Sequence, residues 1–119
     1  MKYNQRIGKF GEILVKNYLV RHKYDIISLN EKISFKEIDI IAKKDKKIIF
    51  VEVKTRSSNI YGDSVDSFNV SKMNNLKTAI EKYIFENKIN EKYLQIDLIA
   101  VDINRPQKTA KIKHFKNIF

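Results

Sequence analysis

The sequence predicts an α/β protein built on a central, mixed five-stranded sheet that is flanked by helices. Two segments carry apolar residues at helical spacing, and five carry the apolar runs or the alternation that is typical of strands. Their order is helix, three strands, helix, two strands, and helices in such an order pack against the sheet. A chain of 119 residues is long enough for one core but not for two, so we expect a single domain over residues 1–119.

The first half of the chain supplies one helix and three strands. The helix is expected over residues 4–22, and the strands over residues 24–33, 35–42 and 47–55. A lysine-rich turn joins the second and third strands, so these two form a hairpin. The buried stripe of the helix consists of Ile7, Phe10, Leu14 and Tyr18, with Ile13 beside them.

The second half begins with a long polar connection, residues 56–69, and a connection of this length in a small domain is mobile or functional. Ser71 is the expected N-cap of a second helix that runs to residue 88. Two strands follow, over residues 93–103 and 108–115. The buried stripe of the second helix consists of Met73, Leu76, Ile80, Tyr83 and Ile84.

Composition limits the possible classes of function. Without cysteine the chain has no disulfides, thiolate metal sites or cysteine nucleophile. No apolar stretch is long enough to span a membrane, and the first residues are too charged for a signal peptide, so we expect a cytoplasmic protein with no membrane partner. A net charge of +10 favours nucleic acid as the partner, because neutralised phosphates release counterions. Twenty of the 24 basic residues are lysine, however, and a genome-wide bias produces the same excess.

The most informative segment is the apolar run 48–53, which continues into an acidic and then a basic side chain. Glu52 and Lys54 are two residues apart, so on a strand they point the same way and lie roughly 7 Å apart. Asp39 lies in the preceding apolar run. An unpaired carboxylate among apolar residues is costly, and a divalent cation accepts two carboxylates at once. The alternative is an ordinary ion pair between Glu52 and Lys54 or a lysine elsewhere.

Two of the three glycines of the chain, Gly8 and Gly11, lie in the first helix, where each costs roughly 1 kcal/mol relative to alanine. Close approach of this helix to the sheet or to a ligand explains them, and it places Glu12 beside the carboxylates on the strands. Alternatively, Gly8 only begins the helix, and Glu12 is a solvated residue that pairs with a lysine one turn away.

Together these segments resemble the YraN family of small bacterial proteins. The likeness spans nearly the whole chain and rests on GKFGE at 8–12, EIDIIA at 37–42, FVEVKTR at 50–56 and a downstream helix opened by Lys72. That family is similar to archaeal Holliday junction resolvases and to the PD-(D/E)XK nucleases. The resemblance therefore implies a restriction-endonuclease-like fold and endonuclease activity on DNA, including branched DNA.

The resemblance also implies the roles of individual residues. Asp39 takes the place of the central metal-binding aspartate, Glu52 that of the second acidic ligand, Lys54 that of the motif lysine, and Glu12 that of the acidic residue of the first helix. Two positions depart from the pattern: Ile38 replaces the superfamily's proline, and Lys36 replaces the glycine that is usual in YraN-like chains. Neither departure removes a ligand.

The implied reaction is metal-dependent hydrolysis of a phosphodiester. Asp39, Glu52 and the carbonyl of Val53 would coordinate Mg²⁺ or Mn²⁺, and Glu12 would help to hold the metal or orient its water. Lys54 would hold that water or stabilise the transition state, or it would only offset the charge of the carboxylates. The flanking phosphates of the substrate would be bound by two further cations, Arg56 and Lys72.

Several alternatives remain open at this level. One is a noncatalytic nucleic-acid-binding module that keeps the fold, and another is a scaffold for a second protein, with residues 117–119 as an open tail. Neither His22 nor His114 has a partner at zinc spacing. Asp97 either supports the site or faces the edge of the sheet. Most aromatic residues fall at core spacing, which argues against a base-stacking surface. Resolution of a four-way junction would call for a symmetric homodimer.

Overall fold

The computed structural model describes residues 3–57 and 70–118, and the secondary structure follows the predicted order. One short 3₁₀ helix before the fourth strand was not predicted. In chain order the elements are α1 (Tyr3–Arg21), β1 (Asp25–Ile33), β2 (Lys36–Lys44), β3 (Lys47–Ser57), α2 (Val70–Glu86), η2 (Glu91–Tyr93), β4 (Leu94–Asn104) and β5 (Thr109–Phe115).

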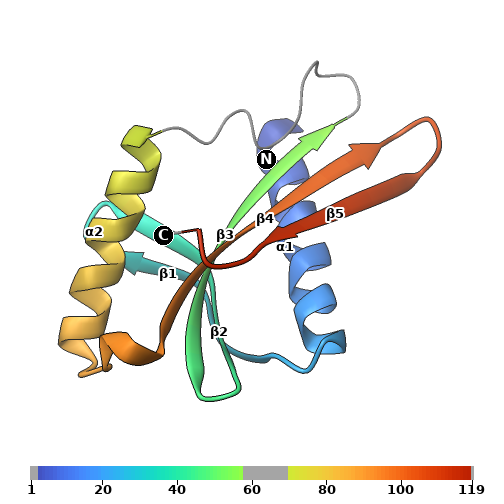
Figure 1. The fold of residues 1–119 in the computed structure, drawn as a ribbon. Coiled ribbons are helices and arrows are strands. Elements are labelled where there is room, and N and C mark those ends of the chain that lie inside the picture. The colour runs from blue at the N-terminus through green and yellow to red at the C-terminus, as the bar shows by residue number, and fades with distance from the viewer. Residues whose placement is uncertain (1–2, 58–69, 119) are drawn as a thin grey trace.

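The five strands form one mixed sheet in the order β1-β2-β3-β4-β5. All neighbouring strands are antiparallel except β3 and β4, which are parallel because α2 lies in the connection between them. Figure 1 shows the two helices on opposite sides of a strongly twisted sheet. The predicted mixed sheet is therefore confirmed, and the architecture is consistent with a restriction-endonuclease-like fold.

Each helix covers its own apolar core. Val15 and Leu19 of α1 pack on one face of the sheet, together with the partly buried Ile7, Leu14 and Tyr18 of the predicted stripe. The other two expected members of that stripe, Phe10 and Ile13, are exposed instead. On the other face, Leu76 and Ile80 of α2 pack against Phe50. The strand residues of the α1 core include Ile40, Val51, Ile99 and Val101, and those of the α2 core include Ile38, Ile41 and Ile96.

The side chains of β2 on either side of Asp39 pack in different cores. Residues two apart on a regular strand share one face of the sheet. Ile38 nevertheless packs in the α2 core, whereas Ile40 packs in the α1 core. The strand is therefore twisted at the residue between them, and Asp39 lies where the two cores meet.

Strands β2 and β3 separate at the same place. Their backbone pairing runs from Lys44 opposite Lys47 to Ile40 opposite Val51 and ends there. One residue further along, the Oδ2 atom of Asp39 accepts a hydrogen bond of 2.8 Å from the backbone N–H of Val53. The carboxylate of Asp39 thus takes the place of the next backbone carbonyl of β2, and the two strands diverge beyond it. This place, at Asp39 of β2 and Val53 of β3, is the fork between the two strands.

The predicted bounds of the elements are accurate to within two residues, but the predicted N-cap of the second helix is wrong. Helix α2 begins at Val70, so Ser71 lies inside the helix and is not its N-cap, contrary to the prediction. Of the polar connection 56–69, the first two residues belong to β3, and residues 58–69 lie outside the described residues. Neither described helix is long and apolar enough to cross a membrane.

Candidate functional site

The fork between β2 and β3 brings Asp39 and Glu52 together. Burial raises the pKa of Asp39 from 3.8 to about 9, and a hydrogen bond and charge repulsion from Glu52 add to this, with a smaller contribution from Glu12. The hydrogen bond from the N–H of Val53 acts in the opposite direction without offsetting the rise. Two carboxyl groups therefore lie in contact, in a place where only a neutral or cation-bound form of Asp39 is favourable.

Glu52 forms an ion pair with a lysine that was not among the predicted site residues. The Nζ atom of Lys36 donates a hydrogen bond of 3.0 Å to Oε2 of Glu52. The side chain of Glu52 is only 6% exposed, whereas that of Lys36 is 29% exposed and reaches the site from β2. Of the alternatives left open, the ion pair of Glu52 with a lysine elsewhere is thus present, together with the contact to Asp39.

Two further lysines lie next to this pair. Burial lowers the pKa of Lys54, the charge of Glu52 acts to raise it, and the neighbouring ammonium groups of Lys72 and Lys36 lower it further. Lys54 is half-buried on β3, and Lys72 extends from the first turn of α2. Glu52 and Lys54 therefore lie close together as predicted, and Lys72 and Lys36 are two further cations next to Lys54.

Glu12 approaches the site from α1 and is anchored by an asparagine. Its Oε1 atom accepts a hydrogen bond of 3.0 Å from Nδ2 of Asn30, and the same Nδ2 donates to Oε1 of Glu37 at 3.0 Å. Glu12 also lies 3.8 Å from Nζ of Lys9, one turn earlier on the helix. Glu12 thus lies close enough to act on the pKa of Asp39, but its carboxylate is bound to Asn30.

Gly11 explains how α1 comes so close to β3. A side chain at this position would collide with the Oγ1 and Cβ atoms of Thr55 on β3. The predicted close approach of helix and sheet is thus confirmed for Gly11. At Gly8 it is not, because nothing lies within contact distance of the place that a Cβ would occupy. Gly11 allows the helix to bring the neighbouring Glu12 toward the fork.

The carboxylate oxygens of Asp39 and Glu52 are suited to a hard cation such as Mg²⁺, although they do not complete its coordination shell. Within residues 3–57 and 70–118, no group of three or more His, Cys, Asp or Glu side chains is arranged to hold a metal ion. Asp39 and Glu52 nonetheless offer carboxylate oxygens at one place, and Mg²⁺ characteristically uses one or two carboxylates, with water and substrate phosphate as its other ligands. Burial and the neighbouring Glu52 raise the pKa of Asp39, and a cation bound by both carboxylates would offset these effects.

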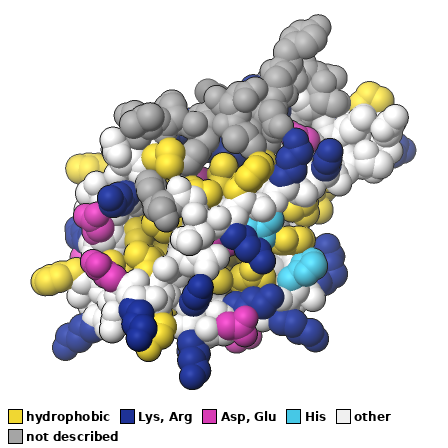
Figure 2. Space-filling view, in the orientation of Figure 1, with side chains coloured by type: hydrophobic (Ala, Val, Ile, Leu, Met, Phe, Trp, Pro, Cys, Tyr) yellow, Lys and Arg dark blue, Asp and Glu magenta, His cyan; other side chains and the backbone are white. Residues whose placement is uncertain are grey.

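The two predicted phosphate-binding residues differ in position. Lys72 lies within electrostatic reach of Lys54 and so belongs to the cluster around Glu52. Arg56 is half-buried two residues beyond Lys54, opposite Asp102 of β4. Figure 2 shows Lys and Arg side chains distributed over several parts of one face of the molecule, with no single continuous patch among the described residues of that face.

A second polar cluster lies inside the protein and was missed. Asp97 is fully buried, and its Oδ2 atom lies 2.7 Å from Nε2 of His114, whose Nδ1 atom lies 2.9 Å from the hydroxyl of Tyr18. Gln95 and the backbone N–H of Asn117 both donate to Oδ1 of Asp97 at 2.9 Å. These hydrogen bonds outweigh the effect of burial and lower the pKa of Asp97.

This cluster corrects two expectations. Asp97 does not face the edge of the sheet, and the contacts found for it lead to His114 and the C-terminal segment. Residues 117–118 are not an open tail, because the N–H of Ile118 donates to the carbonyl of Ile96 at 2.8 Å and its side chain packs on the α2 core. The one signal in the sequence was a charged residue within the alternating apolar pattern of β4.

The expectation for the aromatic residues was also incomplete. Phe10, Phe35, Phe85, Tyr93 and Phe115 are exposed. Phe35 precedes the first residue of β2 and lies in a turn, where no periodicity indicates burial, whereas Phe10, Phe85 and Phe115 lie on exposed positions of α1, α2 and β5. Its position is relevant to the site, because the next residue, Lys36, contacts Glu52.

Comparison with known proteins gives a consistent assignment over nearly the whole chain. The model of an uncharacterised protein family, UPF0102, matches residues 11–101, which contain all four predicted catalytic residues. A UPF0102 protein of Caldicellulosiruptor bescii is 38% identical over 116 residues, covering 97% of this chain and 98% of that protein. Similar proteins of Clostridium tetani and Clostridium botulinum strain 657 are 35% and 38% identical over 117 residues, covering 98% of this chain and 96% and 95% of theirs.

Proposed function

The chain belongs to the uncharacterised protein family UPF0102, the YraN family that its motifs resemble, and we propose that it is a metal-dependent endonuclease that hydrolyses phosphodiester bonds of DNA. The cofactor would be Mg²⁺ or Mn²⁺. The observation that carries this proposal is the enforced contact of Asp39 with Glu52 at the fork between β2 and β3. A carboxylate pair that is largely shielded from water in this way is destabilising unless a cation or a proton neutralises it.

The residues around the pair suit the proposed reaction. The backbone N–H of Val53 fixes Asp39, so one carboxylate is preoriented by the main chain. A cation bound by Asp39 and Glu52 would lower the pKa of a bound water and neutralise charge on the scissile phosphate. Lys54 and Lys72 add positive charge beside Glu52, where a phosphate would receive it in the transition state.

Cleavage assays test the proposal directly. Purified protein is incubated with labelled four-way junction, flap, single-stranded and duplex DNA, with Mg²⁺, with Mn²⁺ or with EDTA. We expect metal-dependent cleavage that Asp39→Asn, Glu52→Gln and Lys54→Met each reduce at least about a hundredfold, since each removes charge from the reacting centre. Arg105→Met, which changes an exposed basic residue between β4 and β5, is the control. Cleavage that survives all three substitutions would refute the assignment of this site.

A second candidate function is a noncatalytic nucleic-acid-binding module, and the ion pair of Lys36 with Glu52 favours it. In this case the ammonium group permanently occupies the place of a metal. The protein would then bind DNA with an affinity that falls steeply with salt, without metal-dependent cleavage. Titration of Mn²⁺ into wild type and Asp39→Asn by calorimetry separates the two candidates, because only the first requires heat of binding that depends on Asp39.

A further inference from the structure

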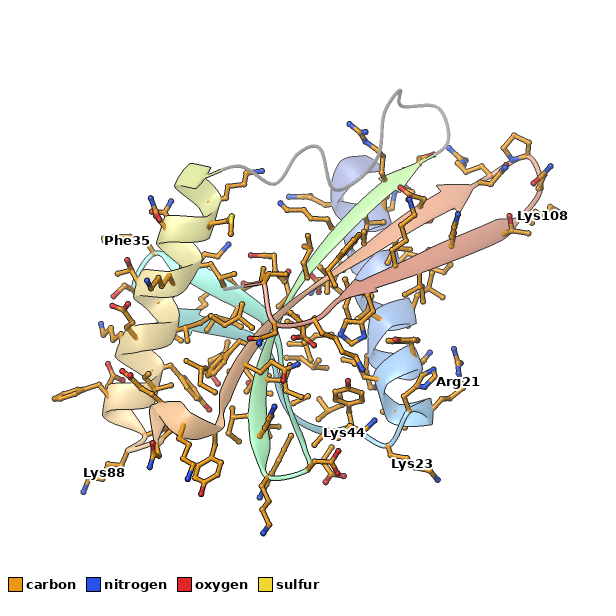
Figure 3. All side chains as sticks on the ribbon, in the orientation of Figure 1. Arg21, Lys23, Phe35, Lys44, Lys88 and Lys108 are labelled. Carbon is orange, nitrogen blue, oxygen red and sulfur yellow. The ribbon has the colours of Figure 1, made fainter. Side chains whose placement is uncertain are left out.

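We infer that Phe35 and the cavity beside it form a binding site for an unpaired nucleobase of the substrate. This inference rests on the proposed function and specifies the class of DNA that the site takes. Phe35 lies in the turn between β1 and β2, beside α2 (Figure 3). Its side chain is fully exposed, so neither the sheet nor α2 covers the ring.

The surroundings of the ring favour a nucleic acid over an apolar partner. A cavity of about 290 Å³ lies between this turn and α2 and contains no acidic residue in its described lining. Its polar groups are amide, hydroxyl and ammonium groups, which suit the edge of a base and a nearby phosphate. The lining consists of Ile33, Ser34, Phe35, Lys36, Asn75, Thr78, Ala79 and Lys82.

The turn that carries Phe35 is fixed to the helix. Ser34 has a positive φ of 56°, and its Oγ atom accepts a hydrogen bond of 2.8 Å from Nζ of Lys82 on α2. Lys82 in turn lies 3.9 Å from Oε1 of Glu86. The backbone that carries the ring therefore has a defined place, which lowers the cost of ordering this turn when a base stacks on the ring.

Lys36 connects this cavity to the candidate catalytic centre. Its side chain lines the cavity, and its Nζ atom lies 3.0 Å from Oε2 of Glu52. Asp39 is four residues beyond Phe35, so the backbone places the Cα atoms of the two residues roughly 13 Å apart. A base stacked on Phe35 would thus be near the cleaved phosphate but not at it, as expected for a bulge, a flap or the arm of a junction.

The test compares Phe35→Ala with Phe85→Ala, because Phe85 is also highly exposed but lies in the last turn of α2, outside the lining of the cavity. Binding of labelled DNA is measured in EDTA, so that cleavage does not interfere. We expect Phe35→Ala to weaken binding to single-stranded, bulged and four-way junction DNA by roughly 5- to 150-fold, the effect of losing one stacked base. Binding to a matched duplex, and every affinity of Phe85→Ala, should remain within about twofold of wild type.

A fluorescence measurement reports the stacking itself. The chain has no tryptophan, so Phe35→Trp and Phe85→Trp each introduce a single indole whose emission can be followed. We expect single-stranded and bulged DNA to quench the indole fluorescence of Phe35→Trp but not that of Phe85→Trp. Unchanged affinity of Phe35→Ala, together with unquenched emission from the DNA complex of Phe35→Trp, would overturn the inference while leaving the proposed function intact.

Three other outcomes are also decisive. If wild type binds none of these DNAs in EDTA and cleaves none of them with Mg²⁺ or Mn²⁺, the proposed function fails and the base site fails with it; if it cleaves them but Phe35→Ala cleaves all of them as well as wild type does, only the base site fails. If Phe35→Ala alters sedimentation of the free protein but none of its DNA affinities, a second copy of the chain covers the ring, and the inference is wrong.

Discussion

The ammonium group of Lys36 lies 3.0 Å from Oε2 of Glu52, at the centre of the candidate metal site. A divalent cation at Glu52 must therefore compete with a lysine of the same chain. The ion pair also sets the charge of the site in the absence of a metal.

Replacement of Lys36 by methionine should tighten the binding of Mn²⁺. Removing a unit charge about 4 Å from a divalent cation is worth about 2 kcal/mol even at the dielectric constant of water, or roughly thirtyfold in affinity. Calorimetric titration measures this change. Lys32→Met, at an exposed position of β1, is the control for net charge. Weaker binding by Lys36→Met than by wild type would show that Lys36 supports the metal site instead of competing with it.

Asp39→Asn should stabilise the metal-free protein. The pKa of Asp39 is about 9 in the folded state and ordinarily 3.8, so the folded protein holds a proton that the unfolded chain releases, and stability falls as pH rises through this interval. Asparagine removes that dependence. We expect a higher Tm for the variant at about pH 8, by several degrees, and a flatter profile of Tm against pH.

Thermal unfolding in EDTA, from about pH 5 to about pH 9, provides this measurement. Added Mn²⁺ should raise the Tm of wild type and leave that of Asp39→Asn nearly unchanged, because only the wild-type pair binds the cation with both carboxylates. A variant that is less stable than wild type across the whole range would contradict this explanation and favour a structural role for the charge.

The two helical glycines should respond oppositely to substitution. Gly11→Ala places a Cβ against Thr55 and should cost about 1 to 3 kcal/mol as overpacking. Gly8→Ala meets no atom and should be neutral or stabilising by up to about 1 kcal/mol, because alanine is the better helix former. Urea unfolding measures both. Equal effects at the two positions would mean that α1 does not press on β3 at Gly11.

Asp97→Asn should destabilise the fold. It removes the charge that His114, Gln95 and the N–H of Asn117 all bind, and disruption of a buried network of this kind costs about 2 to 4 kcal/mol. The pKa of Asp97 is lowered in the folded state, so its contribution to stability is present above about pH 4 and is lost as pH falls further.

Unfolding by urea at about pH 7 and about pH 3 checks this expectation. Wild type should lose stability between the two conditions, and Asp97→Asn should lose less because the titrating group is gone. Asp25→Asn, at an exposed position of β1, is the control. If Asp97→Asn is as stable as wild type at neutral pH, the network contributes no net free energy.

The sequence was sufficient to predict the order of the elements, because the periodicity of helices and strands depends on local spacing. It also indicated that Asp39, Glu52 and Lys54 share a region, since a hairpin fixes which residues oppose each other. Lys36 was not found, because its role depends on the twist of β2 at Asp39, and no local pattern encodes that twist. Asp97 and His114 come from different strands, and their contact exists only once β4 and β5 pair.

The position of Asp39 at the boundary between the two cores has a consequence for how this site can evolve. Its neighbour Ile38 packs in the α2 core and its neighbour Ile40 packs in the α1 core. A substitution that changes side-chain volume in either core is therefore expected to shift the backbone that carries the carboxylate of Asp39. Substitutions far from any reacting atom can therefore adjust the geometry of the acidic pair, while the acidic residues themselves stay the same.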